Sequence, residues 1–430
     1  MTAIVLFSVF IGLIVLRTPV IMAIGVAVIG ALVLAGFGGM LWIVPMKALE
    51  AASNTSLLAI PFFVLAGNLM NAIGVTQRIF NLANALVGHF RAGLAQVNVL
   101  ASVLLAGGTG AATADIAGLG AVEIRAMREK GYSASFASAI TVVSAIVAPF
   151  IPPSIPLVVY AFLANVSVAR MFLAGLVPGL LVAVSLMIFN RYLATRQEFP
   201  TQERASLREI WSHTLTGAAA LIAPAIIMGS ILSGIATASE AGVLACVYII
   251  FLGAILRTLT WDALVKALTE TVLITSMIML IIGFAASMGW LMAIEQIPQD
   301  MARAIPDLID TPIYFLLAVM IAVLLLGLFI DGVTIKLLLV PILLPLVDAY
   351  AIDRVHFGIV LQMSLILGLA TPPLGLGLFI VARISKAPFE EIVAAVLPYF
   401  IPLLIVLAIL ATVPEVSLWL PSTLLGPATP

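Results

Sequence analysis

The chain has 430 residues, of which 63% are hydrophobic and 9% are charged, and its formal net charge is −1. Soluble domains carry about 25% charged residues, so this composition excludes a soluble protein and predicts an all-α polytopic membrane protein embedded in a lipid bilayer. The near-neutral charge predicts no nucleic-acid partner, and the single cysteine excludes a disulfide framework.

Apolar segments that could cross a membrane form two groups of five. A spanning helix needs about 20 apolar residues. In chain order the expected spans are 3–17, 19–36, 54–73, 136–165 and 171–190, then 218–235, 241–256, 270–292, 357–384 and 389–411. Two further apolar stretches, 95–125 and 313–347, have glycine-rich polar centres. Each could be two spans, but irregular backbone at membrane depth favours a re-entrant hairpin.

Two Pro-Pro pairs interrupt corresponding apolar segments of the two halves. Pro152-Pro153 lies within 136–165, and Pro372-Pro373 lies 220 residues later within 357–384. Proline cannot continue a helix, so both segments are expected to be broken helices. Such a break is stable in a membrane only where it is buried in protein or lines a polar site, and matched breaks point to a transporter's binding site.

The charge distribution predicts that the halves, residues 1–215 and 216–430, are repeats inverted in the membrane. Segment 76–93 contains two arginines and no acid, whereas its counterpart, 295–310, contains four acids and one arginine. Basic loops stay in the cytoplasm, so these two loops should face opposite sides. An odd number of crossings per half leads to the same conclusion, and both termini should be periplasmic.

Four polar patterns are candidate binding elements: residues 107–115, 149–156, 327–334 and 368–377. The small and hydroxyl residues of the first favour either a cation site or simple helix packing. Asp331, in the third, is a carboxylate at membrane depth, which is costly and therefore indicates function; the alternative is a tip residue paired with Lys336. The ends of the broken helices offer partial charges that attract a carboxylate or a cation.

Several chemistries find no support in the sequence. There is no G-x-x-x-x-G-K-[ST] loop and no H-E-x-x-H motif, so we expect neither an ATPase nor an enzyme, and no cofactor. Asp115 and Asp331 are the only buried acids expected, which favours a cation over a proton as the coupling ion. The pattern Thr237 to Glu240 is interpreted as an inter-span turn with a helix cap.

The whole chain resembles the large membrane subunit of tripartite ATP-independent periplasmic (TRAP) transporters. The resemblance is carried by IPFFVLAGNLM at 60–70, the glycine-rich segment 107–115, APFIPPSIP at 148–156, the Thr-Ala-Ser-Glu pattern at 237–240, and GLATPPLGLGLF at 368–379. It implies sodium-coupled import of a small organic acid through the bacterial inner membrane. The implied fold is of the elevator type seen in the ion-transporter superfamily, with a scaffold and a transport domain carrying the hairpins and broken helices. The implied partners are a separate four-span membrane subunit and a periplasmic substrate-binding protein.

The resemblance also implies two sodium sites with the substrate between them. The first would be formed by Gly108, Thr109, Gly110, Ser144, Pro149 and Pro152. The second would be formed by Gly327, Asp331, Gly368, Thr371 and Pro372, and its carboxylate makes it the stronger of the two. The substrate is expected near Thr113, Pro153, Ser154, Pro373 and Gly375. The first hairpin reads Gly-Gly-Thr-Gly where the family often has Ser-Gly-Ser-Ser.

Two alternatives stay open at this point. A stand-alone carboxylate symporter or exchanger would transport without a binding protein. A non-transporting membrane scaffold subunit would not need two matched broken helices.

Overall fold

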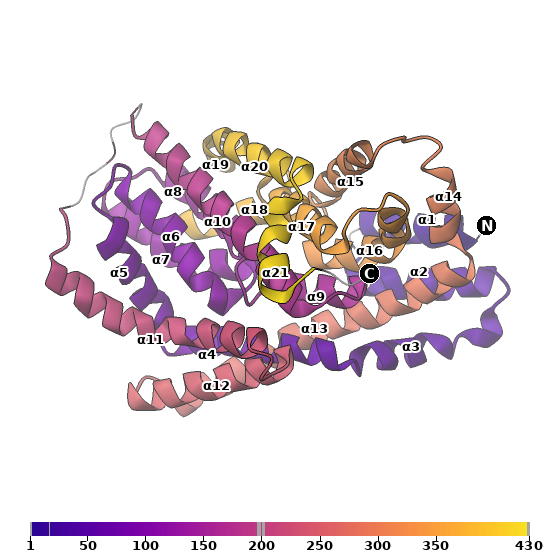
Figure 1. Ribbon diagram of the computed structural model, residues 1–430, viewed down its shortest axis with the longest axis horizontal. Helices are drawn as coiled ribbons and strands as arrows, with labels where there is room; N and C mark the ends of the chain where they lie inside the picture. The colour runs from indigo at the N-terminus through magenta and orange to yellow at the C-terminus, as the bar shows by residue number, and fades with distance from the viewer. Residues whose placement is uncertain (1, 17, 196–198, 200–202, 428–430) are drawn as a thin grey trace.

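A computed structural model describes residues 2–16, 18–195, 199 and 203–427 of the chain (Figure 1). Within these ranges the protein is helical and contains no strand, as its composition predicts. The α-helices are α1 Thr2–Val15, α2 Val20–Leu34, α3 Ile43–Ala52, α4 Ala59–Ala72, α5 Val75–Val87, α6 Gly93–Thr109, α7 Ala112–Glu129, α8 Ala134–Ser144, α9 Ile155–Ala164, α10 Val168–Leu193, α11 Leu207–Leu232, α12 Ala238–Ile255, α13 Trp261–Ile294, α14 Ile297–Ala304, α15 Pro312–Leu326, α16 Gly332–Ala349, α17 Arg354–Ala370, α18 Leu376–Ser385, α19 Phe389–Val396, α20 Phe400–Thr412 and α21 Glu415–Leu425. Short 3-10 turns lie at η1 Gly38–Met40, η2 Thr55–Leu58, η3 Ala145–Val147 and η4 Leu397–Tyr399.

Side chains of Ser, Thr and Asp cap many of these helices at their N-termini. The clearest case is α12, where Thr237 Oγ1 accepts from the Glu240 amide at 3.4 Å and Glu240 Oε2 accepts from the Thr237 amide at 2.8 Å. This reciprocal capping box confirms the prediction of an inter-span turn with a helix cap. Asp331 and Asp353 cap α16 and α17 in the same position. Each such cap stabilises its helix by about 1 kcal/mol.

Helices occupy all ten expected spans, but not all are long enough to cross a membrane alone. By length and composition five described segments qualify, namely α10, α12, α13, α16 and the continuous pair α19–α20. The number rises to seven if the pair α4 and α5, bent by 73°, and the two parts of α11, bent by 45°, each count as one span. The helices α1 and α2 have only 14 and 15 residues, short of the ~20 needed. Helix length therefore does not by itself yield five crossings per half, and the inverted topology stays a prediction.

Four helices, α3, α5, α14 and α21, lie outside both the ten expected spans and the two further apolar stretches. The helices α5 and α14 carry apolar residues on one face and polar residues on the other, which a search for continuous apolar runs overlooks. The bend between α4 and α5 directs the chain away from the line of α4 at Gly74, whose φ is +75°.

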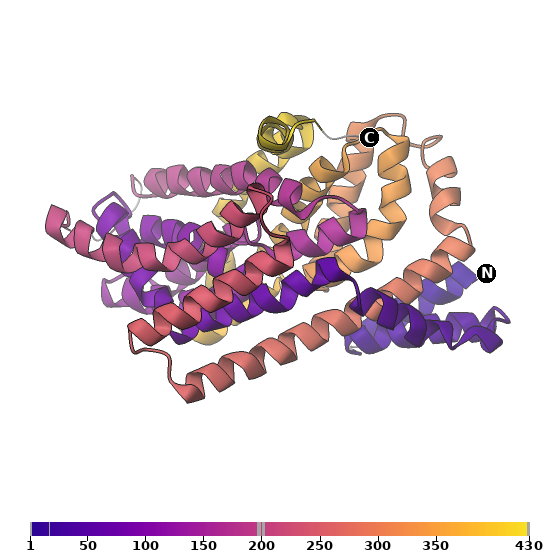
Figure 2. The same ribbon diagram turned by 60° about the horizontal axis from the view of Figure 1, so that its bottom comes forward.

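The helices form two groups that pack along a common boundary (Figures 1 and 2). The helices α2, α3, α4, α11, α12 and α13 lie along one side in Figure 1, and α13, with 34 residues, runs along much of the molecule. The helices α6 to α10 and α17 to α20 form the other group. One large hydrophobic core runs through both groups and includes residues of α4, α11, α12 and α13. A second, smaller core joins α1 and α2 to α13 and α16.

The irregular segments that the sequence pointed to lie in the second group and in α15 and α16, which pack against α17. The helices α6 and α7 form a hairpin that turns at Gly110 and Ala111, and α15 and α16 form another that turns at residues 327–331. The chain is not helical between η3 and α9, nor between α17 and α18. Both Pro-Pro bonds in these breaks are cis.

Candidate functional site

A cavity of about 660 Å³ lies where both hairpins and both broken helices meet. The first hairpin contributes Ala111 to Ala114 and the second contributes Gly327 to Val333. The first break contributes Pro149, Ile155 and Pro156, and the second contributes Leu374 and Leu376. Helices α4 and α13 supply the remaining wall from the other helical group. The cavity is therefore bounded by segments that are distant in sequence and come from both halves of the chain.

The tip of the first hairpin packs directly on the first break because its glycines have no side chains. Gly110 has φ +58°, and a Cβ there would lie 2.7 Å from the Pro153 carbonyl oxygen. A Cβ at Gly107 would lie 3.3 Å from the Pro152 carbonyl oxygen. A Cβ at Gly108 would meet Met70 Sδ at 2.9 Å. The structure thus brings together the hairpin and the break of the first expected sodium site. The Thr109 side chain lies outside the described part of the chain.

Two serine hydroxyls organise the first break. Ser154 Oγ donates to the Pro149 carbonyl oxygen at 2.6 Å and accepts from the Leu157 amide at 3.4 Å, so it spans the break and caps α9. Ser144 Oγ, at the end of α8, donates to Asn98 Oδ1 at 2.5 Å. Both hydroxyls give their proton to a protein acceptor, which leaves oxygen lone pairs that could face a cation. Both residues are fully buried.

The second hairpin and second break approach each other in the same way. A Cβ at Gly368 would lie 2.8 Å from the Gly327 Cα and 2.9 Å from its carbonyl carbon. Thr371 ends α17, and its Oγ1 donates to the Leu367 carbonyl oxygen at 2.7 Å. The Thr371 carbonyl oxygen accepts from the Gly375 amide at 2.9 Å, which closes the turn around Pro372.

Asp331 lies at the cavity and begins α16, and it is exposed rather than buried as expected. Its Oδ2 accepts from the amides of Val333 at 3.0 Å and Thr334 at 3.4 Å. Its expected alternative partner, Lys336, instead donates from Nζ to the Pro156 carbonyl oxygen at 2.9 Å and to Gln362 Oε1. The interpretation in which Asp331 forms an ion pair with Lys336 is therefore wrong. The Asp331 carboxylate instead caps a helix at the cavity wall.

The cavity wall contains some of the expected site residues and polar residues that were not expected. Of the expected substrate residues, Thr113 lines the cavity, whereas Pro153, Ser154, Pro373 and Gly375 lie outside its lining. Of the expected sodium residues, Pro149, Gly327 and Asp331 line the cavity, whereas Gly108, Gly110, Ser144, Pro152, Gly368, Thr371 and Pro372 do not. Polar lining residues that sequence reasoning did not assign to the site are Asn68, Asn71, Lys336 and Gln362.

A second polar group lies behind the first hairpin, within the described protein interior. Asp115 Oδ2 accepts from Ser102 Oγ at 2.9 Å, and Glu123 Oε2 accepts from Thr141 Oγ1 at 3.4 Å. Asn98 Nδ2 donates to Thr141 Oγ1 at 2.9 Å and so links this group to Ser144. Asp115 was expected to be buried. Glu123 was not, because it begins a charged stretch that reads as a loop, yet α7 continues through it and leaves it 1% exposed.

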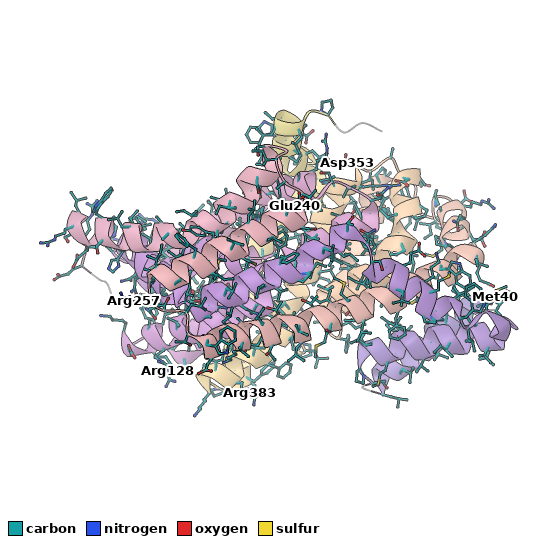
Figure 3. All side chains as sticks on the ribbon, turned by 90° about the horizontal axis from the view of Figure 1, so that it is seen from below. Met40, Arg128, Glu240, Arg257, Asp353 and Arg383 are labelled. Carbon is teal, nitrogen blue, oxygen red and sulfur yellow. The ribbon has the colours of Figure 1, made fainter. Side chains whose placement is uncertain are left out.

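Figure 3 labels five charged residues near the ends of the helices. Arg128, Arg257 and Arg383 lie along the left and lower left, and Glu240 and Asp353 lie above and to the right of them.

Comparison with known proteins places this arrangement among transporters. The family described as "Tripartite ATP-independent periplasmic transporter, DctM component" matches residues 7–416. The chain is 41% identical over 381 residues to the sialic acid TRAP transporter large permease protein SiaM of Vibrio cholerae, covering 88% of this chain and 89% of SiaM. It is 38% identical over 380 residues to the C4-dicarboxylate TRAP transporter large permease protein DctM of Pseudomonas aeruginosa, covering 88% and 89%.

A solved structure with a similar fold is Neisseria gonorrhoeae MtrF, whose description assigns it to a class of antimetabolite efflux pumps. It matches with a TM-score of 0.59 over 89% of this chain and 84% of MtrF. The sequence identity is 12%, so this likeness concerns the fold alone.

Proposed function

Because the chain belongs to the DctM component family of tripartite ATP-independent periplasmic transporters, we propose that it is the membrane permease of a sodium-coupled importer of an organic acid. Its relatives are transport permeases rather than enzymes, and the names of two of them specify sialic acid and C4-dicarboxylates. The transported substrate is accordingly an organic acid. It is delivered by a periplasmic binding protein, and a separate small membrane subunit completes the complex.

One observation carries the proposal: two hairpin tips and two broken helices converge on a single cavity. Broken helices expose positive N-terminal and negative C-terminal ends at membrane depth, which suits a carboxylate and a cation bound side by side. The cavity also lies between two helical groups, with α4 and α13 on one wall and the hairpins and breaks on the other. This arrangement supports alternating access in which the group carrying the hairpins moves against the rest.

The donor atoms near the breaks fit sodium. A hard cation prefers oxygen ligands, and carbonyl oxygens of the breaks, the hydroxyls of Ser144 and Thr371, and the carboxylate of Asp331 are available around the two hairpin contacts. The Asp331 Oδ1 atom makes no hydrogen bond to the described residues, so it is free to face a cation. We place one sodium ion at each contact between a hairpin and a break.

The membrane orientation follows from charge. Loops rich in lysine and arginine remain cytoplasmic, so the side carrying Arg128, Arg257 and Arg383 faces the cytoplasm of a bacterial cell. The opposite side, with Glu240 and Asp353, then faces the binding protein, and both termini are periplasmic.

Charge movement constrains the stoichiometry. A dianion that moves with two sodium ions is neutral and gains nothing from the membrane potential, so a dianion needs more than two sodium ions. A monoanion that moves with two sodium ions carries one net positive charge inward, worth about 2.3 kcal/mol per 100 mV. Uptake of a monoanion should therefore increase when the vesicle interior is made negative.

The test is reconstitution of the chain with its small membrane subunit in proteoliposomes, with the binding protein and a labelled acid outside. We expect uptake to require an inward sodium gradient and the binding protein, and to stop when potassium replaces sodium. Uptake by this chain alone would instead identify a stand-alone carboxylate carrier. Uptake that follows a proton gradient without sodium would contradict sodium coupling, and an assembly that transports normally with Asp331→Ala would contradict the second sodium site.

A further inference from the structure

Lys336 is a buried lysine at the edge of the cavity that forms no salt bridge with the described residues. It lies on α16, one turn beyond the hairpin tip, and its side chain is 1% exposed. No carboxylate of the described residues lies within ion-pair distance of it. A buried charge at membrane depth is costly unless a counter-charge compensates it. Asp331 acts on Lys336 electrostatically but lies beyond ion-pair distance and uses one oxygen to cap α16, so no counter-charge touches the ammonium.

The hydrogen bonds of Lys336 leave one donor free. An ammonium has three N–H donors. Two are used, by the Pro156 carbonyl oxygen at 2.9 Å and by Gln362 Oε1, and no other acceptor lies within hydrogen-bond distance in the described chain. Both acceptors are neutral. They come from α9 and α17, so Lys336 joins one broken helix of each half and its position is firmly determined.

The cavity offers one cationic side chain among its described lining residues, and that residue is Lys336. The one acidic side chain in the lining is Asp331, which uses a carboxylate oxygen to cap α16. The rest of the wall is mainly apolar, with neutral hydrogen-bonding groups from Asn68, Asn71 and Thr113. This combination suits a ligand with one negative charge and an uncharged body that accepts and donates hydrogen bonds.

We propose that the Lys336 ammonium, oriented by Gln362, binds the carboxylate of the transported acid, and that this acid is a monocarboxylate with an otherwise uncharged, polar body. The inference rests on the proposed transport function and specifies the substrate class at its site. A second carboxylate in the same cavity would find no second cationic side chain among the described lining residues and would face mainly apolar side chains and amides, at a desolvation cost. A volume of about 660 Å³ also exceeds what a four-carbon diacid requires and falls in the range typical of larger ligands.

The experiment measures equilibrium binding to the purified membrane complex, the full chain with its small subunit, in sodium chloride. The binding protein is left out so that its own selectivity does not enter. The probes are sialic acid and gluconate as monocarboxylates, the carboxamide of each, and succinate and malate as dicarboxylates. We expect a monocarboxylate to bind at least about tenfold more tightly than both its carboxamide and the dicarboxylates, the size expected for a hydrogen bond to a charged group.

Lys336→Gln tests whether Lys336 binds the carboxylate, and Lys336→Arg tests whether a positive charge at this position is sufficient for that binding. We expect Lys336→Gln to weaken binding of the monocarboxylate by roughly 10- to 100-fold while leaving the carboxamide nearly unaffected, so that the ratio of the two affinities falls toward one. Lys336→Arg should retain a ratio well above one because it keeps the charge. Lys266→Gln, the same substitution at an exposed position of α13 whose side chain is 77% exposed, should leave both affinities unchanged.

The outcomes separate the two proposals. Tighter binding of succinate or malate than of any monocarboxylate overturns the monocarboxylate inference and leaves transport of an organic acid standing. A folded Lys336→Gln protein that still prefers carboxylate to carboxamide overturns the role of Lys336. If that variant does not fold, a wild-type affinity ratio near one overturns the same role. Absence of sodium-driven uptake of every acid by the complete wild-type transporter refutes the proposed function, and this inference with it.

Discussion

Adding a single methyl group at Gly368 should damage sodium coupling. In Gly368→Ala the new Cβ would lie 2.8 Å from the Gly327 Cα, 2.9 Å from its carbonyl carbon and 3.0 Å from its carbonyl oxygen. Carbon atoms in contact prefer about 3.5–4.0 Å, so the second hairpin and α17 must separate by roughly 1 Å. Both neighbours are backbone, which cannot rotate away as a side chain can. Overpacking of this kind costs about 1–3 kcal/mol.

The expected change in sodium affinity can be calculated if the second sodium site forms only when the second hairpin and the second break are in contact. A penalty of 1–3 kcal/mol on the assembled site corresponds to a roughly 5- to 150-fold higher half-saturating sodium concentration. The assay is sodium-dependent uptake in proteoliposomes, together with thermal melting of the purified complex to establish that the variant is folded.

Gly229→Ala, in α11, is the matched control for this substitution. A Cβ there meets no atom within 4 Å, so the change adds helix propensity worth about 1 kcal/mol and no clash. We expect its sodium dependence to equal that of the wild type. A folded Gly368→Ala protein with wild-type sodium dependence would refute the argument that close contact between Gly327 and Gly368 forms the site.

Three further substitutions separate structural from functional roles. Asp331→Asn keeps a capping oxygen but removes the charge, so thermal stability should change little while the half-saturating sodium concentration rises. The same change at Asp353, which caps α17, should alter neither quantity. An unchanged sodium dependence for Asp331→Asn would assign Asp331 to capping alone. Ser154→Ala removes both the bridge to Pro149 and the cap of α9, so we expect a loss of about 1–2 kcal/mol in thermal stability, with recovery in Ser154→Thr. Thr237→Ala removes the capping box of α12 and should cost about 1 kcal/mol, and a shift in its sodium dependence would contradict a purely structural role.

The breaks and hairpins could be predicted because their causes are local. Proline removes a backbone donor and disfavours helical backbone at the residue before it. Single prolines still lie within α10, α11, α16 and α21, whereas both Pro-Pro pairs lie at breaks. The capping box at Thr237 is local for the same reason, because both partners lie within one turn. Apolar length likewise located the segments that became helices, although it overestimated how many are long enough to span a membrane by themselves.

Contacts between distant segments could not be predicted in this way. The approach of Gly110 to Pro153 depends on how the first hairpin docks on the first break, and the sequence shows only that both segments are rich in small or rigid residues. The burial of Glu123 depends on α7 packing on α8, where Thr141 Oγ1 donates a hydrogen bond to the Glu123 carboxylate. A charged stretch next to an apolar run reads as a loop until its partners are known.

The separation of Asp331 from Lys336 shows how helix geometry decides a question that composition leaves open. Two opposite charges in an apolar stretch suggest an ion pair, but side chains meet on a helix when they are three or four residues apart. Five residues at 3.6 per turn place them roughly 140° apart around the axis. Asp331 moreover begins the helix, where its carboxylate satisfies the free amides of the first turn. Lys336 is then directed to Pro156 and Gln362, and its charge remains available to a ligand. If the two charges had been one residue closer, they would have neutralised each other and the cavity would offer a carboxylate no cationic side chain.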